Sequence, residues 1–263
     1  MSLKYSLFRT ARYLDRIFHR LDTLGHRVDT AIHRRSKSFF ALETLAHSRQ
    51  NIREIGAEEI SPRVFEYAFL IRSLPKGGRV LEVGCTATMN FVPILLSDLG
   101  YEVYATDLRP FKVRGKNLQF VLADARHLPF RTVFDACYSV SAVEHIGLPS
   151  ELGPKVEDAE GDIKAMGELQ RILTPGGTAV LTVPFGRRDT LPLIAERIYD
   201  AAGLERLSHG LTVLDEEYVA AVGGEWRKAS RFDAGKADHA TGEIAVAMLK
   251  LRKSPDNVMI AKV

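Results

Sequence analysis

The run Arg79-Val-Leu-Glu-Val-Gly-Cys85 constrains the fold of this chain more than any other stretch. Its central apolar residues are too few for a helix, and two of the three are β-branched, which favours a strand buried on both faces of a sheet. Gly84 follows where the backbone must turn sharply, and the stretch from Met89 to Leu99 has the pattern of a helix. A strand, a glycine turn and a helix in this order predict a nucleotide-type α/β sheet, with exposed backbone N–H groups around a ligand.

A carboxylate ends the next apolar run. That run is Glu102-Val-Tyr-Ala-Thr-Asp107, and Asp107 lies 23 residues after Gly84. An acid at the tip of the second strand, about 20 residues beyond the glycine turn, can accept both hydroxyls of a ribose. Taken alone, Asp107 would be interpreted as a helix N-cap or a turn residue. The glycine upstream favours the ribose interpretation.

Five short motifs occur in the order found in the class I S-adenosylmethionine-dependent methyltransferases, and the chain resembles that family over residues 60–252. The motifs are Val80-Leu-Glu-Val-Gly-Cys85, Tyr104-Ala-Thr-Asp107, Val121-Leu-Ala-Asp124, Phe134-Asp-Ala-Cys137 and Leu173-Thr-Pro-Gly-Gly177. The resemblance implies an α/β fold, with a Rossmann-like seven-stranded sheet and helices on both faces, and S-adenosyl-L-methionine as the cofactor. It also implies O- or N-methylation of a small-molecule or glycan-like acceptor, without a metal.

The same resemblance assigns the cofactor contacts. Asp107 would hold the ribose, Asp124 the amino group of adenine, and the N–H of Ala125 a ring nitrogen. Without the family pattern, Asp124 would be interpreted as a turn residue. Further contacts are implied for Glu82, Gly84, Cys85, Thr86, Leu108 and Ser141.

One departure from the family pattern opens an alternative. Thr86 and Thr88 stand where the family usually has glycines, so two side chains face the place of the cofactor. A catalytically degenerate protein, acting as an oligomeric interaction or scaffold protein, is therefore the second hypothesis. A nicotinamide-dependent oxidoreductase shares the strand-glycine-helix start, but the full dinucleotide glycine pattern is absent.

Candidate catalytic residues follow the predicted strand 134–140. The segment Ser141-Ala-Val-Glu-His-Ile146 comes at the carboxyl edge, where open α/β sheets bind ligands. His145 has a side-chain type whose ordinary pKa suits a general base at neutral pH, and Glu144 would orient it or contact the acceptor. The alternative is that this pair caps a helix or packs beneath the cofactor. Arg197 and Tyr199 would either line the acceptor pocket or pack.

Basic charge is concentrated in an N-terminal arm, residues 1–58, which precedes the predicted domain of residues 59–263. Residues 1–37 carry nine Lys or Arg against three Asp, whereas the rest of the chain has an acidic excess. This distribution argues against nucleic acid as a partner of the domain.

Three successive heptads cover residues 13–33 of the arm and predict an amphipathic helix with a broad apolar face. We expect homo-oligomerisation through this helix, or else peripheral contact with a membrane. The histidines at 19, 26 and 33 each follow an aspartate by four residues, so they are interpreted as helix-surface pairs rather than metal ligands.

The remaining expectations concern compartment and element order. Two cysteines, no apolar run long enough to span a bilayer and no secretory signal favour a reduced, cytoplasmic protein, at most peripheral to the inner face of a membrane. An acidic loop over residues 151–161 is long enough to be a lid. Helices are predicted over 64–74, 163–173, 195–200 and 205–207, and further strands over 118–122, 178–183, 211–218 and 243–251.

Overall fold

A computed structural model of the protein describes residues 62–85, 91–110, 115–149, 157–187, 189–191 and 196–255. The predicted arm, Thr86, Thr88 and residues 151–156 of the predicted lid lie outside the described residues. In chain order the elements are α3 (Arg63–Ser73), β1 (Arg79–Val83), α4 (Phe91–Asp98), β2 (Glu102–Asp107), β3 (Leu118–Leu122), β4 (Phe134–Val140), η2 (Val143–His145), α5 (Gly161–Ile172), β5 (Leu173–Pro184), β6 (Asp189–Leu191), β7 (Glu196–Ile198), α6 (Ala201–Leu207), β8 (Leu211–Val222), β9 (Glu225–Ala229), α7 (Arg231–Ala234), η3 (His239–Thr241) and β10 (Ala245–Lys253).

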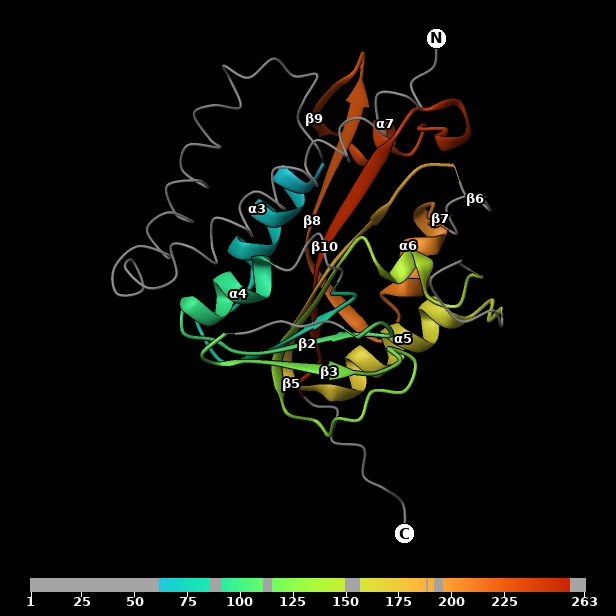
Figure 1. Ribbon diagram of the computed structural model, residues 1–263. Coiled ribbons are helices and arrows are strands. Elements are labelled where there is room, and N and C mark those ends of the chain that lie inside the picture. Colours follow the sequence, from blue (N-terminus) through green and yellow to red (C-terminus); the bar gives the residue numbers. More distant parts are fainter. Residues whose placement is uncertain are drawn as a thin grey trace.

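The strands form an eight-stranded sheet in the order β3-β2-β1-β4-β5-β10-β8-β9, and β6 and β7 form a separate two-stranded ribbon (Figure 1). Strands β1 to β5 pair in parallel. Strands β10, β8 and β9 extend the sheet in antiparallel fashion. Chain order reverses between β1 and β4, so the carboxyl ends of these strands border the place where open α/β sheets bind ligands.

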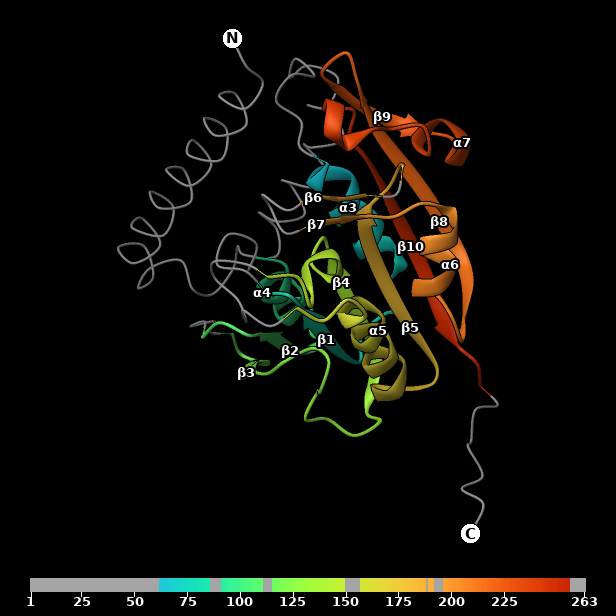
Figure 2. The same cartoon turned by 90° about the vertical axis from the view of Figure 1, so that its right-hand side faces the viewer.

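Helices cover both faces of this sheet (Figure 2). The buried apolar side chains form two separate cores. On one face α3 and α4 bury Phe69, Leu70 and Leu96 against Val80 and Tyr138. On the other face α5 and α6 bury their apolar sides against β1, β4, β5 and β10. The predicted α/β class, with helices on both faces, is confirmed.

The sheet has one strand more than the seven predicted. The stretch after β8 turns at Gly223 and Gly224, whose φ values are +64° and +88°. Two consecutive positive φ angles are what a tight β-hairpin turn requires. Strand β9 therefore folds back onto β8 and adds the eighth strand.

The helix predicted over residues 195–200 is wrong. Residues 196–198 form β7, which pairs with β6. Tyr199 donates its N–H to the carbonyl of Pro184, and this contact holds the chain extended next to β5. Helix α6 begins only afterwards, capped by Asp200, whose side chain accepts the N–H of Gly203 at 2.7 Å.

The two cysteines behave as small buried apolar residues. Cys85 and Cys137 have reduced thiols, and they lie in different cores. Burial raises the pKa of both thiols, so neither is activated as a thiolate. None of the helices in the described ranges has the length and apolarity needed to cross a bilayer.

Candidate functional site

The turn after β1 brings two strand ends close together. Gly84 has a φ of +87°, and a Cβ built on it would collide with the Cβ of Ala142, which follows β4. Only glycine adopts this φ without strain and leaves room for Ala142. The N–H groups of Gly84 and Cys85 both donate to the carbonyl of Thr106, at 3.0 and 3.2 Å. The expectation of exposed N–H groups is therefore wrong at these two positions. The turn instead allows the backbone after β1 to lie close to Ala142 after β4.

Glu82 is a buried carboxyl at the end of β1. It is 6% exposed, and its Oε2 has no hydrogen-bond partner among the described residues. Burial raises the pKa of Glu82 to about 8, against an opposing hydrogen bond with Cys85. The hydroxyl of Tyr138, its neighbour in β4, also lacks a partner within the described ranges. Two unpaired polar atoms on adjacent strands mark a place where a ligand's donor group would be satisfied.

Two further carboxylates stand at the tips of β2 and β3. Asp107 ends β2, and Asp124 follows β3. Each accepts hydrogen bonds from the arginine two residues later. Asp107 receives the backbone N–H, Nε and Nη2 of Arg109 at 2.9 to 3.0 Å. Asp124 receives the same three groups of Arg126 at 2.7 to 3.1 Å, which lowers the pKa of Asp124.

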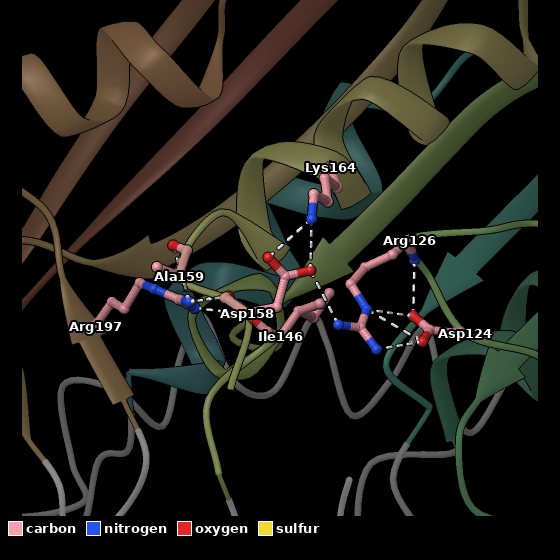
Figure 3. Close-up of polar contacts among 7 residues, drawn as sticks. All are labelled: Asp124, Arg126, Ile146, Asp158, Ala159, Lys164 and Arg197. Carbon is pink, nitrogen blue, oxygen red and sulfur yellow. Dashed lines mark hydrogen bonds and ion pairs between the residues drawn. The ribbon is translucent and has the colours of Figure 1, made fainter. Parts of the chain in front are cut away.

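Arg126 also connects the tip of β3 to the start of α5 (Figure 3). Its Nη1 donates to Oδ2 of Asp158 at 3.0 Å. The Nζ of Lys164, in the first turn of α5, donates to both carboxylate oxygens of Asp158 at 2.9 Å. Asp124 is thus the end of a chain of alternating charges, in which each group is partly exposed.

Arg197, on β7, holds backbone from the other side of this network (Figure 3). It donates to the carbonyls of Glu144, Ile146 and Asp158 at 2.7 to 3.2 Å, and its side chain is 12% exposed. Tyr199 donates its hydroxyl to a buried aspartate of α5 at 2.9 Å. Of the two roles considered for Arg197 and Tyr199, these contacts support packing.

The turn after β4 is strained and is held by a side chain from α3. Ser141 has a φ of +42°, the only positive φ at a non-glycine residue in the part of the chain that is described. Its Oγ donates to Oε1 of Glu66 at 2.7 Å, and Thr182 of β5 donates to the same oxygen at 2.6 Å. The other carboxylate oxygen of Glu66 accepts from Arg63 at 2.7 Å. Glu66 is fully buried, so this carboxylate joins α3, the turn and β5 in one network.

Glu144 and His145 follow this turn in η2. Glu144 is 1% exposed, and its Oε2 has no partner among the described residues. Burial is the main cause that raises the pKa of Glu144 well above its ordinary value, with Glu196 and Glu66 adding to it and Arg63 opposing it. The side chain of His145 is 44% exposed, with Nε2 at 3.9 Å from Oε1 of Glu144. A buried acid beside an exposed imidazole is an arrangement that can pass a proton to solvent.

The predicted site residues come from the ends of β1 to β4, at one edge of the sheet. Leu108 is 46% exposed next to Asp107 and offers an apolar surface. Ala125 and Cys85 are buried in the cores, so only their backbone is available to a ligand. Thr86 lies outside the described residues. Among the described residues, no group of three or more His, Cys, Asp or Glu is suited to a metal ion.

Four residues of this site were not among the predicted ones. Arg109 and Arg126 had a visible signal, since each stands two positions after a predicted ligand acid in the repeated pattern Asp-x-Arg. Glu66 and Arg63 had none. Glu66 meets its partners across 75 and 116 positions of sequence, and such contacts follow no local periodicity.

This chain is similar to known proteins in sequence and in fold. A sequence family described as "Caenorhabditis protein of unknown function, DUF268" matches residues 102–253. No curated protein sequence matches the chain. Among solved structures, the cyclase SpnF is 20% identical, with a TM-score of 0.50 over 72% of this chain and 80% of its own. A SAM-dependent methyltransferase from Methanosarcina mazei is 14% identical, with a TM-score of 0.49 over 72% of this chain and 98% of its own. The N-methyltransferase NodS from Bradyrhizobium japonicum is 16% identical, with a TM-score of 0.49 over 73% of this chain and 96% of its own.

The chain has a Rossmann-like α/β fold, as its strand order and its likeness to SpnF show. Identities of this size concern the fold alone. Because SpnF is a cyclase, the fold does not by itself determine the reaction, and the chemistry has to be argued from the site.

Proposed function

The chain belongs to the family described as "Caenorhabditis protein of unknown function, DUF268", and we propose that it transfers a methyl group from S-adenosylmethionine to a small-molecule or glycan-like acceptor. The observation that carries this proposal is the position of Asp107 and Asp124. They stand at the tips of the neighbouring strands β2 and β3, beside the turn at Gly84. Adjacent strands are about 4.8 Å apart, so one adenosyl group can reach both acids.

The residues present suit the parts of the cofactor. Asp107 would hold the ribose hydroxyls, and Asp124 with the backbone of Ala125 would hold the polar edge of adenine. Leu108 is exposed and apolar, which suits contact with the face of the ring. Glu82 has an unpaired oxygen for the ammonium group of the methionine part.

Binding of ribose requires a change at Asp107. A carboxylate has about four acceptor positions, and Arg109 uses three of them. The two ribose hydroxyls therefore compete with Arg109. Its side chain is 43% exposed, so its movement into solvent needs no rearrangement of the core.

When bound, the cofactor supplies a methyl group activated by a positively charged sulfur. The protein has to align the acceptor and remove its proton. We assign the removal of this proton to Glu144 and His145. The ionised carboxyl of Glu144 accepts the proton inside the site, where burial favours the protonated form. His145 then carries it to the surface, since its ring lies 3.9 Å from that carboxyl and is 44% exposed.

A second candidate is an interaction protein that has kept the fold without the reaction. The strand-tip acids and the N–H groups of Gly84 and Cys85 already have partners inside the protein. These groups therefore need no ligand as a hydrogen-bond partner, unlike Glu82 and Tyr138.

Titration of the full chain with S-adenosylmethionine in a calorimeter separates these candidates. We expect micromolar affinity, with a loss of about 100-fold in Asp107→Ala because two hydrogen bonds to a charged group are removed. The control is Asp135→Ala. Asp135 lies at the opposite edge of the sheet, where it accepts a hydrogen bond from the N–H of Arg79. No heat at millimolar ligand would favour the interaction protein, and equal losses in both variants would refute the role of Asp107.

We also propose that the heptad arm, residues 1–58, makes the protein a homo-oligomer. Its repeating apolar positions support this proposal. Deleting residues 1–37 is expected to lower the mass seen by light scattering. An unchanged mass, with loss of binding to anionic vesicles, would assign the arm to a membrane surface instead.

A further inference from the structure

Three glutamates from three different elements are influenced by the charge of one arginine on the acceptor side of the site. Glu66 comes from α3, Glu144 from η2 and Glu196 from β7. Arg63 lies at the start of α3, and its charge partly offsets the rise that burial causes in the pKa values of Glu144 and Glu196. Within this group Arg63 forms an ion pair with Glu66, at 2.7 Å.

The cluster has more acid than base. Arg197 contacts the backbone of Glu144, but its charge partner is Asp162 at 3.9 Å. His145 and Tyr199 also face Glu144, and the raised pKa of Tyr199 keeps its phenol neutral. Among the described residues of this cluster, ionisation of all three glutamates would therefore set three negative charges against the one positive charge of Arg63.

Glu144 is the more deeply buried of the two glutamates that are not paired with Arg63. It is 1% exposed, and its Oε2 has no hydrogen-bond partner among the described residues. The pKa values of Glu144 and Glu196 are both raised, chiefly by burial, so both tend to hold protons when nothing else is bound. A buried carboxyl of this kind is satisfied by a group that brings both donors and positive charge.

The geometry points to an amine as the methyl acceptor, bound in its ammonium form between Glu144, Glu196 and the Glu66–Arg63 pair. This inference rests on the proposed function. An ammonium has a positive charge and up to three donors, whereas a hydroxyl has one donor and no charge. A metal ion is a poorer candidate, because among the described residues these carboxyls do not form a group suited to one.

The reaction balances with the residues named. The ammonium gives one proton to the carboxylate of Glu144, which exposes the nitrogen lone pair. That pair forms the new N–C bond while the C–S bond breaks and its electrons go to sulfur, which becomes a neutral thioether. The methylated nitrogen is positive again until it loses a further proton, and the proton on Glu144 leaves through His145.

The test measures binding to the full chain with a simple probe. We expect 50 mM butylammonium chloride to raise the thermal midpoint by about 3 °C relative to sodium chloride at equal ionic strength, and butanol to leave it unchanged. The shift should disappear in Glu144→Gln and shrink in Glu196→Gln. It should persist in the control Glu225→Gln, which changes an exposed glutamate on β9.

The results separate this inference from the proposed function. An equal shift with butanol, no shift with butylammonium, or a shift that survives both glutamine variants would overturn the amine site. Should Glu144→Gln fail to fold, Glu196→Gln carries the test, because Glu196 is only partly buried. An amine-dependent shift without S-adenosylmethionine binding would keep the site and refute methyl transfer. Cofactor binding without the amine-dependent shift would keep the proposed methyl transfer and refute the amine site.

Discussion

Glu66 is expected to be the most sensitive single position for stability outside the apolar cores. Its carboxylate is fully buried and accepts from the hydroxyls of Ser141 and Thr182 and from the guanidinium of Arg63. In Glu66→Gln the amide oxygen can still accept both hydroxyls, but the amide NH2 group faces Arg63. Loss of one bond between charged groups and weakening of two others amount to about 3 kcal/mol.

Substitutions at Ser141 test the same network from the other end. Ser141→Ala and Ser141→Gly both remove the hydroxyl bond to Glu66, but only glycine relieves the φ of +42°. The left-handed conformation costs an L-residue about 1–2 kcal/mol. Glycine avoids this cost, but part of the gain is offset because glycine makes the unfolded chain more flexible. We therefore expect the glycine variant to be the more stable of the two, by about 1 kcal/mol.

Urea unfolding of the full chain measures both effects, provided that the slope m stays constant across the variants. A double-mutant cycle between Glu66→Gln and Ser141→Ala should give a coupling of about 1 kcal/mol, because the two residues share a hydrogen bond. If Glu66→Gln unfolds within 0.5 kcal/mol of the wild type, or if alanine at 141 is as stable as glycine, the strain and the network do not have the roles assigned here.

Three further outcomes are expected. Gly84→Ala should lower stability by at least about 2 kcal/mol in urea, since its φ of +87° and the contact with Ala142 leave no room for a methyl group; a loss below half of that would contradict the close approach. The folded pKa of Glu82, about 8, lies above its unfolded value of about 4.5, so the stabilising protonation is complete below pH 4.5 and is lost as the pH rises towards 8. Unfolding at pH 5 and pH 8 should show this fall, and Glu82→Gln should flatten it; a wild type equally stable at both would argue against the shift. Arg197→Lys should speed hydrogen exchange around residues 158–161, because one ammonium cannot reach the carbonyls that the guanidinium holds; unchanged protection would mean that those bonds do not hold the segment.

Local pattern determined much of this protein. Alternation, glycine turns and apolar runs predicted the parallel strands β1 to β4 nearly to the residue, whereas β5 begins at Leu173 rather than at the predicted residue 178. The acid at the tip of β2 was predicted from its spacing to the glycine turn, and the acid after β3 from the family resemblance. These features depend on neighbours within a few positions, which the sequence displays directly. The hairpin at Gly223 and the extended path of residues 196–198 escaped this approach, because the pairing partner decides between strand, loop and helix there.

The polar network was decided by the tertiary structure. Nothing near Glu66 in the sequence indicates that it meets Ser141 and Thr182, since the contact exists only after α3 packs across β4 and β5. The same holds for the acid excess around Glu144, which depends on three elements that meet at one edge of the sheet. Charges act through space rather than along the chain, so their balance at a site can be counted only when the fold has brought them together.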